Sequence, residues 1–230
     1  MKSDIELMKI HVEVLFSQDE NGGLLGINEP DGDAMLAPRF FLGHTSEGSI
    51  CRFRYDLPEY VVMQLKEAVA TEPMVMGQRT ISQFHDILQS HAPVERVWYG
   101  PAYCFPERIE SPANVVRLSR KNAGLLKGDF AEMVPELDDA QPYFAVVEDS
   151  QAVSICRSVR LSSRAHEAGV DTLESYRRRG YATSAVAAWA LAVRALNLIP
   201  LYSTSRDNVV SQSVARRLGL IQYGVDYHVT

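Results

Sequence analysis

The fold of this chain is decided by an alternating run, Gly169-Val170-Asp171-Thr172-Leu173, that leads into the basic loop Arg177-Arg178-Arg179-Gly180-Tyr181-Ala182 and then into a long alanine-rich helix. The run has the pattern of a strand. Because the first N–H groups of a helix lack internal partners and the helix dipole adds positive charge there, a strand, a basic loop and a helix start predict a seat for an anion. Gly180 lets the backbone approach a ligand without a Cβ in the way, and the arginines can bind phosphate oxygens.

This basic loop resembles the acyl-CoA loop of the GNAT superfamily of N-acetyltransferases, whose pattern is Gln/Arg-x-x-Gly-x-Gly/Ala. Arg177, Gly180 and Ala182 fill the three defined positions. Six residues of this kind are a weak signal alone, so the surrounding sequence has to support them.

A second motif of the same family follows along the chain. Ile199 to Ser205 is a strand candidate, after which Asp207-Asn208-Val209-Val210-Ser211 opens a helix that ends in Ala215-Arg216-Arg217-Leu218-Gly219-Leu220. The corresponding family helix opens with an Asn and a small polar residue and ends in Lys/Arg-Leu-Gly-Phe, so Leu220 stands where Phe is usual. Both motifs come in the family's order, and the resemblance covers roughly residues 113 to 230.

The predicted elements of this second half also follow the family core. A strand over 114–118 and an interrupted helix over 122–137 come first. Two antiparallel strands, 143–147 and 153–161, then precede a strand over 166–173, a helix over 181–196 and the strand candidate 199–205. The resemblance therefore implies an α/β fold with a GNAT-type mixed central sheet flanked by helices. The two early helices of the family are compressed into one region here.

The first half of the chain carries no chemical motif and reads as an α+β region. A hairpin is predicted over residues 39–55, and two helices follow it. Pro106 and Pro112 frame a linker. We expect two parts. Residues 1–110 would form the wall of the acceptor site that the early helices form in the family, and residues 113–230 would form the acetyl-CoA-binding domain.

The resemblance implies which residues hold acetyl-CoA. In the family, the strand before the loop pairs its backbone with the pantetheine arm, the loop and helix start hold the diphosphate, and the second helix touches the pantetheine. No metal is expected. On the matching positions, the residues that would bind acetyl-CoA are Asp171, Thr172, Leu173, Arg177, Arg178, Arg179, Gly180, Tyr181, Ala182, Thr183, Asn208 and Ser211. Asn208 can equally be an ordinary helix cap.

For the catalytic base we select Glu167. Glu167 and Asp171 lie at i and i+4 of the predicted central strand and so share one face, whereas His166 is on the other face. Carboxylates on this strand often serve as the base in relatives. A solvated strand end is the alternative for Glu167, and a structural role is expected for His166.

The general acid is harder to place. Many relatives use a Tyr in the last helix, and Ala215 occupies that position here. Tyr202, Tyr223 and Tyr227 are substitutes by their place in the chain, and we retain Tyr223 as the candidate. Cys156 lies in an apolar run without a nearby His and is expected to be a buried thiol.

Composition limits the partners. The net charge of −6 argues against broad nucleic-acid binding, and no apolar run is long enough for a membrane span. The segment Met1–Glu6 has acidic residues where a signal peptide would be basic. Three cysteines make neither a disulfide framework nor a metal cluster, which favours a cytoplasmic location. A homodimer is possible.

The most favoured function is transfer of an acetyl group from acetyl-CoA to a primary amine of a small molecule. Acetylation of a protein N-terminus or lysine is a second alternative. A non-catalytic acyl-CoA sensor is a third, which the absence of the usual Tyr favours, and an interaction module with a degenerate site is a fourth.

Overall fold

The computed structural model describes residues 2–32, 35–70 and 78–230. Its helices are α1 (Asp4–Leu15), α2 (Glu59–Ala70), α3 (Gln78–His91), α4 (Tyr181–Ala195) and α5 (Val209–Arg217). Its strands are β1 (Phe16–Gln18), β2 (Leu24–Ile27), β3 (Phe40–Thr45), β4 (Gly48–Phe53), β5 (Val97–Cys104), β6 (Val116–Arg117), β7 (Tyr143–Glu148), β8 (Gln151–Leu161), β9 (Ala165–Thr172), β10 (Ile199–Ser203) and β11 (Ile221–Val229). Short 3-10 turns are η1 (Arg120–Leu125), η2 (Gly128–Met133), η3 (Pro135–Leu137) and η4 (Glu174–Tyr176).

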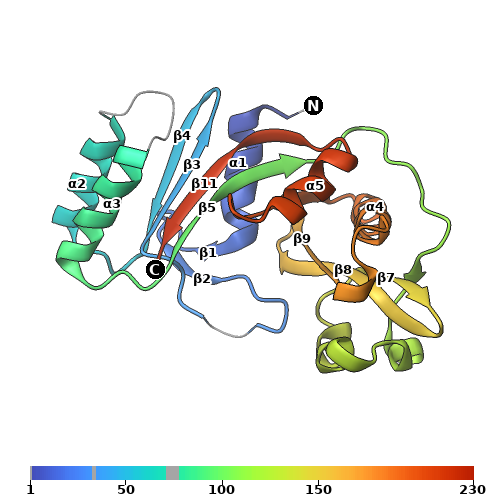
Figure 1. Ribbon diagram of the computed structural model, residues 1–230. Coiled ribbons are helices and arrows are strands. Elements are labelled where there is room, and N and C mark those ends of the chain that lie inside the picture. Colours follow the sequence, from blue (N-terminus) through green and yellow to red (C-terminus); the bar gives the residue numbers. More distant parts are fainter. Residues whose placement is uncertain (1, 33–34, 71–77) are drawn as a thin grey trace.

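One mixed sheet passes through the molecule in the strand order β4-β3-β11-β5-β10-β9-β8-β7-β6 (Figure 1). Strands β9 and β10 are parallel, and the other neighbouring pairs are antiparallel. A parallel pair needs a crossover connection, which α4 supplies. The predicted α/β fold with a mixed central sheet flanked by helices is therefore confirmed.

Strands from the two halves of the chain alternate in this sheet. Strand β5 lies between β10 and β11, and β11 pairs with β3 on its other side. The pairing of β5 with β11 runs from Cys104 opposite Ile221 to Val97 opposite Val229. The division into residues 1–110 and 113–230 thus remains a proposal about function, since the sheet itself runs across it.

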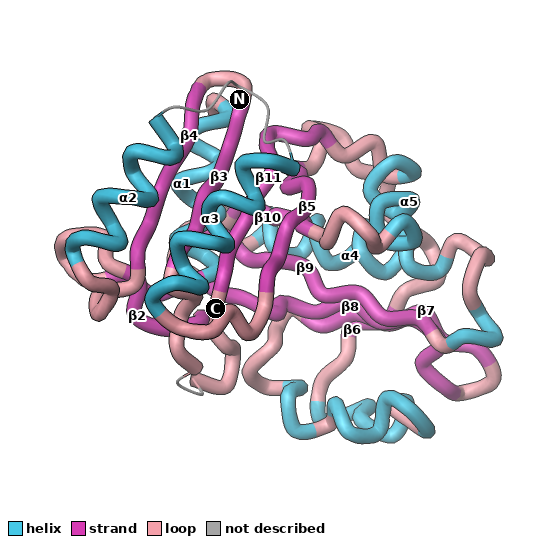
Figure 2. Tube along the Cα trace, turned by 60° about the vertical axis from the view of Figure 1, so that its left-hand side comes forward, coloured by secondary structure: helices cyan, strands magenta, loops and turns pink. Residues whose placement is uncertain are grey.

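The helices cover the sheet on opposite faces. Neighbouring residues of a strand point to opposite sides, and on β10 Leu201 packs in the apolar cluster of α1, whereas Tyr202 packs in the cluster of α4 and α5. Phe40 and Leu42 of β3 pack with α2 and α3, while Phe41 packs with α1. Figure 2 shows α4 on one side of β7 and β8 and the 3-10 turns on the other.

The two parallel strands separate part of the way along. Strand β9 pairs with β10 only over Ala165–Glu167, opposite Ile199–Leu201. Beyond that point β9 continues to Thr172 with β8 as its partner, while β10 follows β5. The backbone of residues 168–172 consequently has one edge that no strand of the described chain covers.

Most local expectations are confirmed, and two differ from the structure. The hairpins β3–β4 and β7–β8 and the helices α4 and α5 form where the sequence predicts them. The expected helix over 122–137 is replaced by the turns η1 to η3, because Gly124, Gly128 and Pro135 interrupt it. The alternation of Ile10 with its neighbours belongs to the helix α1, which is buried on several sides.

Candidate functional site

A pocket of about 1400 Å³ opens where β9 and β10 separate. It lies between the free edge of β9, the basic loop before α4, the start of α5 and the turn η2. All twelve residues predicted to bind the cofactor line this one pocket, namely Asp171, Thr172, Leu173, Arg177, Arg178, Arg179, Gly180, Tyr181, Ala182, Thr183, Asn208 and Ser211. Segments distant in sequence are thereby brought to one place.

The N-terminus of α4 is open toward this pocket. Its N-cap is Gly180, with φ of 85° and no side chain to cap the first turn. A Cβ built on Gly180 would meet no atom within 4 Å. Arg178 also has a positive φ, 64°, which is unusual for a residue with a side chain. The uncapped N–H groups of Tyr181, Ala182 and Thr183 have no intrahelical acceptor and can bind an anion.

The three arginines of the loop are exposed and add positive charge at the same helix end. Arg179 lies over the ring of Tyr176, with 5.1 Å between its guanidinium carbon and the ring centroid, and donates to the carbonyl of Ser175. Within residues 2–32, 35–70 and 78–230, no carboxylate pairs with Arg177, Arg178 or Arg179. Their charge is available to a polyanionic ligand.

The open edge of β9 offers its backbone, because two side chains there are already engaged. The Thr172 hydroxyl lies 2.7 Å from the hydroxyl of Ser154. The Asp171 carboxylate accepts from Arg157 at 3.0 Å. Since these contacts hold the side chains on β8, the groups that can pair with an extended ligand are those backbone N–H and C=O groups of residues 168–172 that point away from β8.

The start of α5 closes the other side of the pocket. The side chain of Asn208 accepts from the Ser211 N–H at 3.0 Å, which makes it the N-cap of α5. The Ser211 hydroxyl lies 2.6 Å from the Tyr202 hydroxyl. The alternative role of Asn208 as a helix cap is therefore confirmed, and both residues still line the pocket.

We expect Asn208→Ala to lower the free energy of unfolding by about 1 kcal/mol, because it removes the cap of α5. For a chain of this size that corresponds to a fall in Tm of roughly 2–4 °C. Asn208→Asp keeps a capping oxygen and should keep the Tm, while its negative charge weakens binding of an anionic ligand. Thermal unfolding and calorimetry of both variants test this, and an unchanged Tm in Asn208→Ala would rule out the capping role.

The two catalytic candidates lie outside the pocket lining but close to one another. Glu167 is at the point where β9 and β10 separate, is only 3% exposed and lies 3.8 Å from the imidazole of His11. Burial raises the pKa of Glu167, while His11 and Ser203 oppose the rise. Tyr223 is buried beside His11, with 6.0 Å between their ring centroids, and its hydroxyl pKa is raised well above the usual value, chiefly by burial.

The remaining tyrosines and the cysteine have structural surroundings. Ala215 is fully buried in the core between α4 and α5. Tyr227 packs among the residues of α2 and α3. Cys156 is fully buried, and burial raises its pKa well above the usual value, as expected for a structural thiol. His166 is on the opposite face from Glu167, as predicted, with its Nδ1 2.9 Å from the Ser158 hydroxyl.

Sequence reasoning missed His11 and Asp226, which contact or approach Glu167 in the fold. His11 Nε2 lies 3.5 Å from Asp226 Oδ2. Each is a lone ionisable residue between apolar neighbours in the sequence, in Ile10-His11-Val12 and Val225-Asp226-Tyr227. An ionisable side chain in such a run is a signal for a buried polar site, although it does not reveal the partner.

The described residues offer neither a metal site nor a membrane-spanning helix. Across the part of the chain that the structure describes, no group of three or more His, Cys, Asp or Glu side chains has a metal-binding arrangement. Over residues 2–32, 35–70 and 78–230, no helix combines the length and apolar character that crossing a bilayer requires.

Comparison with known proteins identifies the fold. Residues 143–229 match the sequence model of the GNAT acetyltransferase family. A comparison with curated proteins gives no match. Among solved structures, a GCN5-related N-acetyltransferase-like protein from Streptococcus suis 89/1591 is similar over 99% of this chain and 100% of its own, with 16% identity and a TM-score of 0.51.

Two further solved structures match the chain. An acetyltransferase of the GNAT family from Colwellia psychrerythraea is similar over 100% of this chain and 97% of its own, with 8% identity and a TM-score of 0.50. A putative acetyltransferase of the GNAT family from Novosphingobium aromaticivorans DSM 12444 matches over 59% of this chain and 65% of that protein, with 16% identity and a TM-score of 0.47. The family match confirms the resemblance predicted from the two motifs.

Proposed function

Since residues 143–229 match the sequence model of the GNAT acetyltransferase family, we propose that this protein is an N-acetyltransferase that moves an acetyl group from acetyl-CoA to a primary amine of a small molecule. The observation that carries the proposal is the pocket itself. The uncapped N-terminus of α4 and the three loop arginines suit a diphosphate. The free edge of β9 suits an extended arm that contains amide groups.

The chain's own residues would hold acetyl-CoA in this order. The N–H groups of Tyr181 to Thr183 and the arginines at 177–179 would take the diphosphate, and the edge of residues 168–172 would pair with the pantetheine arm. When bound, acetyl-CoA supplies an acetyl thioester with a thiolate leaving group. Fixing both reactants at the point where the strands separate would provide much of the acceleration.

Glu167 would receive the proton that the acceptor ammonium must lose. It is the carboxylate at the inner end of the separation between β9 and β10, and Ser203 of β10, half-buried, lies beside it. A pKa raised by burial suits a base that works near neutral pH. The raised pKa of Tyr223 makes its hydroxyl a weak proton donor. Solvent in the pocket would therefore protonate the departing thiolate, whose conjugate thiol has a low pKa.

The first half of the chain would form the acceptor side. Helix α1 covers the sheet face to which Glu167 points, and Glu167 contacts α1 through His11. The acceptor amine would then approach from that face, with residues 1–110 shaping its site. This division of roles extends the proposal of two functional parts.

We also propose a cytoplasmic location. Cys51, Cys104 and Cys156 are all free thiols. Unpaired cysteines are typical of proteins in a reducing compartment.

A panel of small amines with acetyl-CoA tests the function by release of free thiol. We expect turnover with at least one primary amine and a matching acetylated product by mass spectrometry. Peptides with a free N-terminus or a lysine should be included, since their preferential acetylation would replace the small-molecule acceptor with a protein one.

A specific observation also favours the acyl-CoA sensor. Glu167 and Tyr223 do not line the pocket, and Ala215 fills the position of the usual acid. A protein that binds acetyl-CoA tightly but releases no thiol with any amine of the panel would be such a sensor.

A further inference from the structure

A second group of polar side chains lies behind the pocket, deep in the sheet. His11 of α1, Glu167 of β9, and Tyr223 and Asp226 of β11 are all at most 3% exposed. His11 Nδ1 lies 3.8 Å from Glu167 Oε2, and His11 Nε2 lies 3.5 Å from Asp226 Oδ2. One imidazole thus stands between two buried carboxylates that come from different strands.

We propose that His11 is a positioning residue that joins Glu167 and Asp226 into one buried unit sharing a proton, and that it thereby sets the charge state of Glu167. The role of Glu167 as a base rests on the proposed function. The joint titration of the three groups does not, and it can be tested separately.

The unit has few partners outside itself. Ser203 of β10 is a hydrogen-bond partner of Glu167, while among the described residues both ring nitrogens of His11 and Asp226 Oδ2 have no hydrogen-bond partner outside the unit. Two buried carboxylates without a balancing charge are strongly unfavourable. The imidazole is the cation that can balance them, and its proton can move toward either one.

The directions of titration agree with this geometry. Burial lowers the pKa of His11, but Asp226 and then Glu167 outweigh burial, so the pKa is raised. His11 in turn opposes the burial that raises the pKa of Glu167. His228, 3.9 Å from Asp226, has its pKa lowered to about 4 by burial and is neutral near pH 7. The titrations of His11 and Glu167 are therefore coupled.

His11 is the group of the unit that can carry the balancing positive charge, because the neighbouring basic side chains are neutral or already paired. The titratable and charged side chains that act on its members are Tyr202 of β10, Tyr223 and His228 of β11, and Arg160 of β8. Arg160 is bound to Glu29 at 2.8 Å. Trp98 of β5 donates to Asp226 Oδ1 at 3.3 Å, which leaves Oδ2 toward His11.

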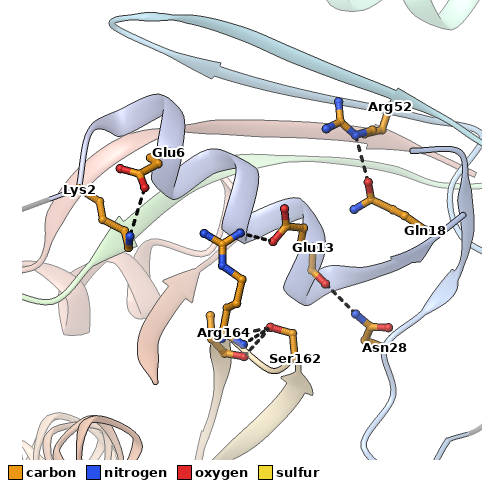
Figure 3. Close-up of polar contacts among 9 residues, drawn as sticks. Lys2, Glu6, Glu13, Gln18, Asn28, Arg52, Ser162 and Arg164 are labelled. Carbon is orange, nitrogen blue, oxygen red and sulfur yellow. Dashed lines mark hydrogen bonds and ion pairs between the residues drawn. The ribbon is translucent and has the colours of Figure 1, made fainter. Parts of the chain in front are cut away.

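Helix α1 is fixed in place, so His11 cannot turn away. Figure 3 shows Arg164, just before β9, bound to Glu13 of α1 at 2.7 Å. Asn28 donates to the last carbonyls of α1, those of Glu13 and Val14. Ile10 and Val12, on either side of His11, are fully buried against the sheet. This packing sets the distance between His11 and both carboxylates.

In the reaction, the acceptor R–NH₃⁺ and the Glu167 carboxylate would become R–NH₂ and the Glu167 carboxylic acid. Before this transfer His11 carries the proton that the unit shares, and the transfer does not consume that proton. Its positive charge favours the carboxylate before the transfer, so Glu167 can accept a proton at a pH where burial alone would keep it neutral.

Histidine NMR of the full chain tests the joint titration without any assay of activity. With ¹⁵N-labelled histidine and the His11 signal assigned by its loss in His11→Gln, we expect His11 to titrate above the ordinary value of about 6.5. The midpoint should fall in Glu167→Gln and in Asp226→Asn, which are isosteric changes. A His11 that is neutral at all pH values, or a midpoint unaffected by both changes, would overturn the proposal.

Kinetics test the role in the reaction. In His11→Gln, the acid limb of the pH–rate profile should move to higher pH, since the pKa of Glu167 rises, while KM for acetyl-CoA stays unchanged. His166→Gln removes another buried histidine, 6% exposed, from the opposite sheet face and should leave the limb in place. Equal effects of both changes would mean a merely structural role. Absence of activity in the unmodified protein would refute the proposed function but leave the NMR result standing.

Discussion

In a folded Gly180→Val variant, we expect the affinity for CoA to fall about tenfold to hundredfold, or ~1.4 to ~2.7 kcal/mol. Gly180 has φ of 85°, a conformation that costs a β-branched residue on the order of 1–3 kcal/mol. The loop would relax to relieve this strain and turn the N–H groups of α4 away from the ligand. The added side chain would also enter the open space beside the helix end, where no protein atom lies within 4 Å.

The matched control is Gly32→Val. Gly32 has φ of 79° and also open space around its Cβ, but it does not line the pocket. It should show similar strain and lose stability, with the CoA affinity intact. Calorimetry on both variants separates the effect of backbone strain from the effect of ligand contact. Unchanged CoA affinity in folded Gly180→Val would refute the assignment of the loop as the diphosphate-binding site.

The second large effect is expected from Glu167→Gln, which keeps the shape of the side chain and removes the base. Turnover at neutral pH should fall roughly 10²-fold or more, the usual scale for loss of a general base. CoA affinity should stay the same, because Glu167 does not line the pocket. Activity of the unmodified protein should decline as pH falls through the raised pKa of Glu167, since its protonated form cannot accept a proton.

High pH provides the internal check of this prediction. As the free amine becomes abundant, Glu167→Gln should recover much of its turnover. Glu67→Gln removes an exposed carboxylate from α2 and should behave like the unmodified protein. Turnover equal to that of the unmodified protein across the pH range in Glu167→Gln would show that another group, or water, takes the proton.

Features encoded over short distances were predictable from the sequence. Alternating apolar residues and turn residues predicted both hairpins, and a glycine between a strand and an alanine run predicted the start of α4. The twelve residues that the sequence predicted for the cofactor lie around one pocket. Their contact with acetyl-CoA stays a prediction.

Features that depend on distant pairing were not predictable. Nothing in Val97–Cys104 indicates that β5 inserts between β10 and β11. Helix α1 has only a narrow polar stripe, Glu6, Lys9 and Glu13, and the burial of Ile10, Val12 and Val14 gives its sequence an alternating look that hides the helical period. The contact of His11 with Glu167 likewise arises only when α1 packs on β9.

The central claim is that one acyl-CoA binds along the free edge of β9 and at the start of α4. Hydrogen–deuterium exchange of the unmodified protein, with and without acetyl-CoA, tests it most directly, because amides without intramolecular acceptors exchange fast until a ligand covers them. We predict that acetyl-CoA protects residues 168–173 and 178–184, and leaves the β3–β4 hairpin unchanged. Unaltered exchange in both segments at saturating acetyl-CoA, or protection confined to other parts of the chain, would contradict the account.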